Sequence, residues 1–312
     1  MPIANVKRLL ITGGCGFIGT NLIAALRADG GPEIRVLDNE RLGKREHLSG
    51  FDVAFIPGDI RDADIVAAAL QGVDAVVHLA ADTRVMDSIE DPAFNFDCNV
   101  VGTFTLLMAM RKAGVEYIVN ASTGGAILGE APPPVHEDMP PKPESPYGAG
   151  KLAVEGYLSA FAHSYGMKAA SLRFSNVYGP RSYHKGSVVA HFFKRILAGK
   201  DLVVYGDGGQ LRDYVYVDDL CRGVLQALDS GMSGVFQLGT GIPTSINALI
   251  ERMRETVGDR RFQVCYEPSR PGEITNTYCD IAKAQKAFGF APVVRLPEGL
   301  RITWEWFLDN WR

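Results

Sequence analysis

Excess positive charge is the first property that this sequence lacks. Its 32 Lys and Arg residues are outnumbered by 36 Asp and Glu residues, which gives a formal net charge of -4 at pH 7. Proteins that bind nucleic-acid phosphates normally present a basic face, and no basic stripe runs along this chain. We therefore expect no nucleic-acid partner.

Paired cysteines and long apolar runs are also missing. The five cysteines, at positions 15, 98, 221, 265 and 279, are odd in number and never form a CxxC pair, which favours a reducing compartment. The first apolar stretch meets glycines too early for a secretion signal, and no run of about 18 apolar residues occurs. We expect a cytoplasmic protein without membrane association. No cluster has metal-ligand spacing and no GxSxG motif occurs, so no metal site is expected.

The residues that are present have the composition of a globular protein, with 46% hydrophobic and 22% charged residues in a chain of 312. Strand-like runs at 33–38, 52–60, 72–81 and 114–123 alternate with helical stretches near 62–71 and 94–113. This alternation predicts an α/β fold with a doubly wound parallel sheet, the Rossmann arrangement.

Three glycines, Gly13, Gly16 and Gly19, stand between a buried strand and an amphipathic helix in RLLITGGCGFIGTNLIAALRADG. Glycine is needed at such a turn because a Cβ atom would keep the backbone away from a dinucleotide pyrophosphate above the helix N-terminus. The following strand ends in Asp38, which is placed to accept hydrogen bonds from ribose hydroxyls and to repel a 2′-phosphate. We therefore expect NAD as the cofactor.

NADP stays open as an alternative, because three cations that bind phosphate follow Asp38: Arg41, Lys44 and Arg45. Further strand ends meet at the same edge of the sheet. Asp59 and Ile60 end one strand where an adenine ring would rest, and the run from His78 to Asp82 ends another. His78 itself lies inside an apolar strand, so we interpret it as a core histidine rather than a base.

Tyr147 and Lys151, in SPYGAGK, are four residues apart and share one face of a helix. A free phenol has a pKa of about 10 and is a poor base at neutral pH. A fixed ammonium group beside it favours the phenolate, as does the positive ring of an oxidised nicotinamide. The pair is therefore a candidate for proton transfer during alcohol oxidation.

Taken in order, TGGCGFIG, Asp38, GDI, HLAAD, NVVGT, AST and YGAGK resemble the extended short-chain dehydrogenase/reductase family, and within it the nucleotide-sugar epimerases and dehydratases. The downstream motifs SNVYGPR, YGDGGQLRDYVYVDD and RPGE extend the resemblance over nearly the whole chain. The resemblance implies a catalytic set of Thr123, with Ser122 as the adjacent candidate, Tyr147 and Lys151. It also implies a set of cofactor-binding residues: Gly13, Gly16, Phe17, Ile18, Gly19, Asp38, Asn39, Asp59, Ile60, Leu79, Ala80, Ala81, Asn99, Tyr147 and Lys151.

The residues after Thr123 bear on the reaction. Dehydratases of this family look like Thr-Asp-Glu at the strand end, whereas this chain has Gly124, Gly125 and Ala126, and its first carboxylate comes only at Glu130. Without those acids the simplest outcome is inversion of the sugar, and the resemblance is greatest to UDP-hexose 4-epimerases. One departure is Leu128, which stands where most relatives have Tyr.

The C-terminal part resembles the family's substrate-binding domain. Its implied contacts are Asn176, Arg212 and Arg270 for the diphosphate and Glu273 for the nucleoside ribose, and the full substrate set is Thr83, Thr123, Tyr147, Asn176, Val189, Tyr205, Arg212, Arg270, Glu273 and Thr277. We expect an NAD-binding domain at 1–180, with 213–240 returning to it, and a nucleotide-sugar-binding domain at 181–312.

Two substrate hypotheses follow from departures in this part. Thr277 stands where some hexose-only relatives have a bulky Tyr, which predicts tolerance of 2-acetamido sugars. His184 and Lys185 place positive charge near the entrance, which suits a uronic acid carboxylate. Open alternatives to a UDP-hexose 4-epimerase are a nucleotide-sugar dehydratase, a UDP-uronate 4-epimerase and a non-catalytic NAD-binding sensor. The family resemblance also implies a homodimer formed through the helices at 94–113 and 147–166.

Overall fold

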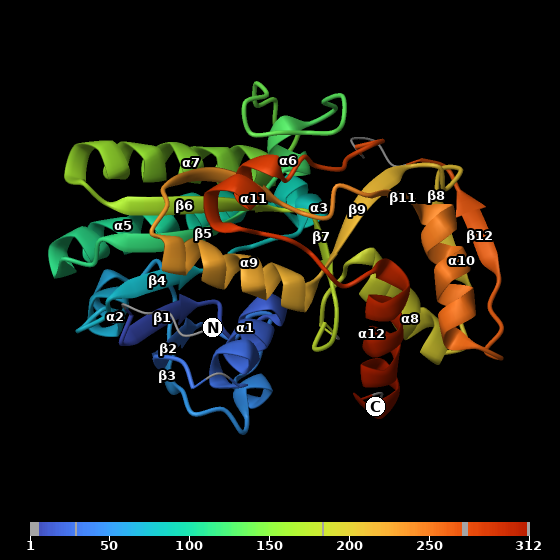
Figure 1. Ribbon diagram of the computed structural model, residues 1–312, viewed down its shortest axis with the longest axis horizontal. Helices are drawn as coiled ribbons and strands as arrows, with labels where there is room; N and C mark the ends of the chain where they lie inside the picture. The colour runs from blue at the N-terminus through green and yellow to red at the C-terminus, as the bar shows by residue number, and fades with distance from the viewer. Residues whose placement is uncertain (1–5, 29, 183, 270–273, 311–312) are drawn as a thin grey trace.

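A parallel sheet of seven strands forms the centre of the molecule in the computed structural model, which describes residues 6–28, 30–182, 184–269 and 274–310 (Figure 1). Its order is β10-β6-β5-β4-β1-β2-β3, and every neighbouring pair is parallel. The strands are β1 (Arg8–Thr12), β2 (Glu33–Asp38), β3 (Ala54–Pro57), β4 (Ala75–His78), β5 (Tyr117–Thr123), β6 (Lys168–Phe174) and β10 (Gly234–Leu238). The predicted doubly wound fold is therefore confirmed.

Helices cover both faces of this sheet because its strands are apolar on both sides. In β1, Leu9 and Ile11 belong to one buried cluster and Leu10 to another, as alternation along a strand requires. One face carries α1 (Phe17–Ala28), α9 (Val217–Ser230) and α11 (Ala282–Phe288), and the other carries α2 (Ala63–Ala69), α5 (Gly102–Ala113) and α7 (Pro146–Tyr165).

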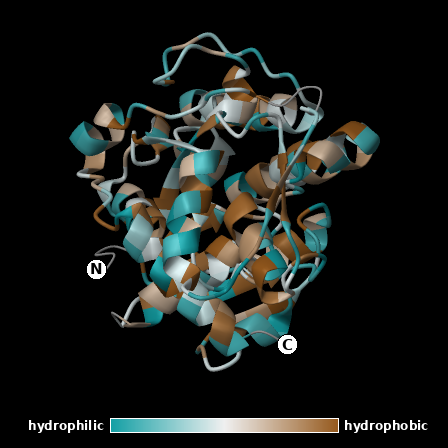
Figure 2. Ribbon diagram, turned by 90° about the vertical axis from the view of Figure 1, so that its right-hand side faces the viewer, coloured by the Kyte–Doolittle hydropathy of each residue, from teal (hydrophilic) through white to brown (hydrophobic). Residues whose placement is uncertain are grey.

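A second lobe lies beyond the C-terminal ends of the main strands, on the right in Figure 1. It contains a three-stranded sheet of β7 (Asn176–Tyr178), β9 (Leu211–Tyr216) and β11 (Pro243–Ser245), and a pair formed by β8 (Leu202–Tyr205) and β12 (Val264–Glu267). Its helices are α8 (Val188–Leu197), α10 (Ile246–Val257) and α12 (Leu296–Asn310). Figure 2 looks onto this lobe, where the helices carry both hydrophilic and hydrophobic turns, and a separate buried cluster fills its interior.

The remaining elements are short helical turns beside the sheet edge. They are η1 (Arg45–Leu48), α3 (Val85–Glu90), α4 (Pro92–Phe96), the π-helical turn η2 (Asp97–Val101) and α6 (Gly125–Leu128). Leu128, the departure from the family pattern, is only 1% exposed and belongs to a buried cluster. Its side chain therefore contributes to the core of the fold.

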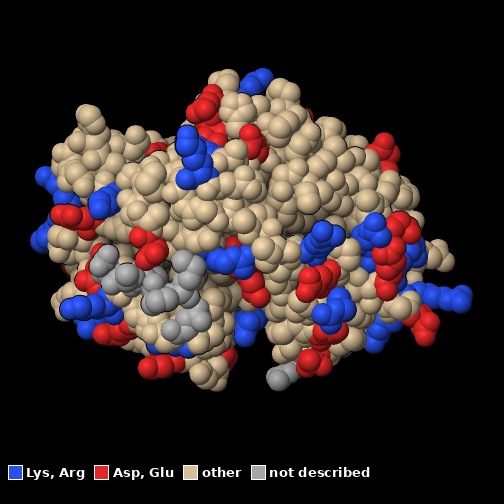
Figure 3. Space-filling model, in the orientation of Figure 1, with Lys and Arg blue, Asp and Glu red and all other residues tan. Residues whose placement is uncertain are grey.

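One continuous helical stretch, Pro92–Ala113, is long and apolar enough by length and composition to cross a membrane, among the residues that the structure describes. It is made of α4, η2 and α5, and 44% of its apolar 18-residue window is buried within the fold, where the stretch packs on α2 and α7. A layer helix of an α/β protein has the same properties. Positive and negative side chains are interspersed over the face drawn in Figure 3.

Candidate active site

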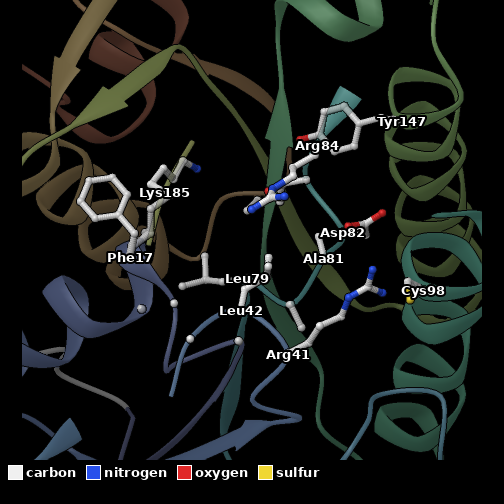
Figure 4. A pocket seen from close by; sticks show the side chains of 18 of the residues that line it. Phe17, Arg41, Leu42, Leu79, Ala81, Asp82, Arg84, Cys98, Tyr147 and Lys185 are labelled. Atoms are coloured by element: carbon white, nitrogen blue, oxygen red, sulfur yellow. The ribbon is translucent and has the colours of Figure 1, made fainter. Parts of the chain in front are cut away.

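A cavity of about 860 Å³ opens at the carboxyl edge of the main sheet, where the strand ends meet the second lobe. Its walls come from the glycine turn after β1, the ends of β2, β4 and β5, the start of α7, and the loop after β7. Figure 4 shows side chains from these separate elements facing the same space. Such a crevice at the carboxyl ends of parallel strands is the usual ligand site of doubly wound folds.

The glycine turn is shaped by close backbone contacts. Gly13 has φ +71°, and a Cβ atom there would lie 2.6 Å from the backbone nitrogen of Ala80. A Cβ on Gly19 would lie 2.6 Å from the Cα of Gly14. These contacts leave room for glycine only, and they hold the N-terminus of α1 open toward the cavity. The turn therefore fits a dinucleotide pyrophosphate.

Asp38 lies at the cavity wall and is 9% exposed. Its carboxylate accepts hydrogen bonds from the backbone N–H groups of Cys15, at 2.9 Å, and Glu40, at 2.8 Å. Burial nevertheless raises its pKa above the ordinary value. The carboxylate is thus held in place at the end of β2 for a ribose.

Two of the cations that left NADP open as an alternative cofactor, Arg41 and Lys44, contact neighbouring residues. The Arg41 guanidinium lies 3.8 Å from the centre of the Phe94 ring, and the Lys44 ammonium donates to the Glu40 carbonyl at 2.6 Å. Beside them, Asp59 binds Arg61, which lowers its pKa to about 2. Among the described residues, no cation forms an ion pair with the Asp38 carboxylate, which favours an unphosphorylated ribose.

Tyr147 and Lys151 come from the first turns of α7, which begins with Pro146 and is capped by the Ser145 hydroxyl. Lys151 donates to the carbonyl of Ala121 at 2.9 Å, and burial lowers its pKa to about 8. Burial also raises the pKa of Tyr147 above its ordinary value, and Asp82 adds to this effect. In the cofactor-free chain Lys151 thus does not bring Tyr147 into the useful range, and further positive charge is required in the cavity.

Ser122 and Thr123 have different surroundings although they are adjacent. The Ser122 hydroxyl is buried and donates to Glu155 at 2.6 Å, and Glu155 in turn binds Arg173. Thr123, the last residue of β5, is only partly buried and lines the cavity. Of the two hydroxyls, that of Thr123 remains available to a ligand.

In the folded chain, the turn after β5 places no carboxylate beside Tyr147. A Cβ on Gly124 would lie 2.5 Å from the side-chain oxygen of Gln237, so Gly124 packs closely against β10 of the main sheet. Glu130, the first carboxylate after Thr123, accepts a hydrogen bond from the backbone N–H of Thr275. Neither position directs a carboxylate at Tyr147.

Most of the predicted site residues gather at the cavity. They are Gly13, Gly16, Phe17, Ile18, Gly19, Asp38, Asn39, Asp59, Ile60, Leu79, Ala80, Ala81, Thr83, Ser122, Thr123, Tyr147, Lys151 and Asn176. Five others lie outside its walls: Asn99, Val189, Tyr205, Arg212 and Thr277. Arg270 and Glu273 lie outside the described residues.

The residues outside the cavity have identifiable roles. Asn99 is buried and binds both the backbone N–H and the carbonyl of Asp82, which fixes the end of β4. Val189 is 2% exposed in the core of the second lobe. His78 is also in the core, as expected: its ring nitrogens lie 2.7 Å from the Thr12 hydroxyl and 2.9 Å from the Thr103 hydroxyl.

The run from His78 to Asp82 was predicted to end at this edge, but the predicted site residues include neither Asp82 nor Arg84. Both residues lie in the segment after β4 and line the cavity. Figure 4 shows Arg84 near the Tyr147 ring and Asp82 below it. The signal that was available is their position just beyond a strand end at the carboxyl edge. Among the described residues, no group of three or more His, Cys, Asp or Glu side chains is arranged to hold a metal ion.

A glycine turn shaped for a dinucleotide, an acid at the end of β2, and a Tyr and Lys on one helix define a nicotinamide-dependent enzyme that acts on an alcohol. Comparison with known proteins makes the class specific. The model of the NAD dependent epimerase/dehydratase family matches residues 9–239, and the chain belongs to this family. NAD is therefore its cofactor, and the cavity residues fit that group.

Individual relatives span nearly the whole chain. This chain is 38% identical to the UDP-glucose 4-epimerase of Mycolicibacterium smegmatis. The match covers 97% of this chain and 99% of that one. The structure of UDP-glucose 4-epimerase with UDP-glucose from Thermotoga maritima has a TM-score of 0.93 and 39% identity, covering 98% of this chain and 100% of that one. The UDP-N-acetylglucosamine 4-epimerase of Methanobrevibacter ruminantium has a TM-score of 0.90 and 32% identity, covering 97% and 99%.

Proposed function

We propose that this protein epimerises a UDP-hexose at C4, interconverting UDP-glucose and UDP-galactose through a 4-keto sugar. The observation that carries the proposal is the placement of Thr123, Tyr147 and Lys151 at one cavity, with no carboxylate from the turn after β5 directed at them. The relatives named as UDP-glucose 4-epimerases support the same reaction.

Each protein group has one task in this reaction. Tyr147 removes the proton from the C4 hydroxyl and later returns it, and the Thr123 hydroxyl orients the sugar oxygen. Lys151, held on the Ala121 carbonyl, stabilises negative charge on the phenol and binds the nicotinamide ribose. The bound dinucleotide supplies the reversible redox chemistry. Inversion follows when the keto sugar presents its opposite face, and this requires no third titratable group.

The second lobe holds the nucleotide sugar in this proposal. Asn176 lines the cavity, and Arg212, Arg270 and Glu273 serve the diphosphate and ribose. Thr277 lies outside the cavity walls, but its hydroxyl lies 3.4 Å from where a Cβ of Gly125 would be, two residues after Thr123. Its small side chain at this place supports acceptance of 2-acetamido sugars. The comparison with a UDP-N-acetylglucosamine 4-epimerase agrees with this substrate range. If the protein does not turn over UDP-N-acetylglucosamine, the proposed acceptance of 2-acetamido sugars is wrong.

The proposed domains are residues 1–180 with 213–240 for NAD, and the rest of 181–312 for the nucleotide sugar. The pairing of β10 with β6 supports the returning segment. We place the protein in the cytoplasm because its five cysteines are free.

A homodimer is part of the proposal, formed through α5 and α7. Large apolar side chains are exposed on this face, including Phe104 at 39%, Met108 at 42% and Tyr157 at 43%. Phe104 packs against Tyr157 at 5.2 Å between ring centres, which joins the two helices into one surface. Phe104→Glu should shift the protein from dimer to monomer in sedimentation, whereas the control Ile242→Glu, at another exposed site, should not.

The reaction is tested by incubating the purified protein with UDP-glucose, UDP-galactose, UDP-glucuronate and UDP-N-acetylglucosamine, and analysing products by NMR and mass spectrometry. An epimer conserves mass, whereas a dehydratase product loses water. Tyr147→Phe should abolish turnover while NAD stays bound. The sensor alternative predicts two different results. The wild type would turn over none of these sugars, and Tyr147→Phe would keep the full biological function of the protein.

A further inference from the structure

Residues 180–182 and 184–187, between β7 and α8, lie against the glycine turn and α1, and we call them the crossing loop. His184 stacks on His47 of η1, with 5.1 Å between ring centres and 18° between planes. His47 is itself attached to the turn, because its Nδ1 lies 3.0 Å from the Cys15 carbonyl. The crossing loop thus spans from the second lobe to the far side of the dinucleotide cradle.

Several contacts hold the loop in this position. Asn21 of α1 donates to the Pro180 carbonyl at 3.0 Å and accepts from Arg181 at 3.2 Å. Arg181 adopts φ +62°, a conformation that a non-glycine residue keeps only when its surroundings enforce it. Lys194 of α8 donates to the Lys185 carbonyl at 2.9 Å. The path of the loop is therefore fixed from both sides.

Lys185 is directed by this loop into the cavity, close to the N-terminus of α1. Its ammonium lies 5.9 Å from the centre of the Phe17 ring, and Figure 4 shows the two side chains together. Among the described residues, no carboxylate forms an ion pair with it. Burial lowers its pKa. A desolvated ammonium without a counter-ion is unfavourable, so this position is suited to an anion.

The place of Lys185 indicates which anion. Phe17 is the first residue of α1 and follows Gly16, so Lys185 lies opposite the free N–H groups of that helix start. A dinucleotide pyrophosphate occupies this position in a doubly wound fold. The substrate diphosphate, by contrast, was assigned to Asn176 and the second lobe.

We propose that Lys185 binds the pyrophosphate of NAD and that the crossing loop, latched by the His184–His47 stack, retains the cofactor between turnovers. This role of Lys185 is separate from epimerisation: it sets the lifetime of bound NAD and is the same whichever sugar is the substrate. Burial lowers the pKa of His184 to about 4, so the stacked ring is neutral at pH 7 and carries no charge that opposes the Lys185 ammonium.

The test measures NAD binding directly. NAD is removed from the wild type, Lys185→Met and the control Lys286→Met, whose side chain is exposed on α11, and affinity is measured by calorimetry at several salt concentrations. Loss of one charge-assisted hydrogen bond should weaken NAD roughly 10- to 100-fold and reduce the salt dependence by about one ion. Lys286→Met should match the wild type, and Lys185→Arg should recover most of the affinity. Unfolding of the NAD-free variants checks that each is folded.

The latch is tested by the rate of NAD release from His184→Ala, which should increase at least about fivefold while the structure of the NAD-free chain is unchanged. Unchanged NAD affinity in Lys185→Met would overturn the proposal. If Lys185→Met kept the wild-type NAD affinity but had a raised KM for UDP-sugars, the ammonium would belong to the substrate site. These results do not depend on whether the wild type epimerises UDP-glucose, so failure of the proposed reaction is recognised separately.

Discussion

The buried ion pair between α7 and β6 gives a sharp prediction about stability. Arg173 donates to both oxygens of Glu155, at 3.0 and 2.7 Å, and the two side chains are each 5% exposed. Arg173→Met removes both bonds and leaves the Glu155 carboxylate with the Ser122 hydroxyl as its remaining partner. Breaking such a pair from one side costs about 3–5 kcal/mol, a large part of the roughly 5–15 kcal/mol that stabilises a typical domain.

The double variant separates the charge from the packing. With Glu155→Leu added to Arg173→Met, no unpaired charge remains, and most of the lost free energy of unfolding should return. The matched single variant Glu155→Leu strands Arg173, whose Nη1 already has no hydrogen-bond partner, and should be as damaging as Arg173→Met. Urea unfolding of the NAD-free chain measures all four proteins. A loss under about 1 kcal/mol at pH 8, or a double variant no better than the singles, would refute the reasoning.

Three further predictions concern the cavity. Gly19→Ala should abolish NAD binding in calorimetry, since its Cβ would lie 2.6 Å from the Gly14 Cα, whereas Gly156→Ala, with open space around the added Cβ, should bind normally. Asp38→Ala should reduce the preference for NAD over NADP roughly 10- to 100-fold in binding titrations, and an unchanged ratio would contradict the assigned role. Lys151→Met should stabilise the NAD-free chain at pH 7 by roughly 2 kcal/mol, because the Lys151 pKa of about 8 in the folded chain is below its unfolded value. The free energy of unfolding of the wild type should therefore rise as pH increases from 8 to about 10.5. The variant should show no such rise.

The sheet could be predicted from the sequence because apolar strand-like runs alternate with helical stretches, and the residues of β1 and β4 are almost all buried. Tyr147 and Lys151 could be proposed as a pair from their spacing on one helix, whereas Thr123 was assigned by the family resemblance. The contacts of the second lobe were harder to predict from the sequence. Val189 and Tyr205 were assigned by resemblance, yet they lie outside the cavity walls, because packing between short elements determines which way their side chains face.

The crossing loop could not be predicted for a different reason. Residues 47 and 184 are far apart in the chain, and neither hydropathy nor motif spacing records that their rings stack. Lys185 was recognised as a charge near the entrance, but its position opposite α1 depends on Asn21 and Arg181 holding the loop. Contacts of this kind become visible only in the assembled fold.

The place of β10 in the sheet also affects how the chain is made. It pairs with β6, yet about 60 residues, which include most strands of the second lobe and α9, are synthesised between the two strands. A nascent chain that ends near residue 180 therefore presents β6 as an unprotected edge, which attracts other strands. We expect the fragment 1–180 to aggregate when expressed alone, and the emergence of residues 234–238 from the ribosome to be the step that makes the N-terminal half soluble.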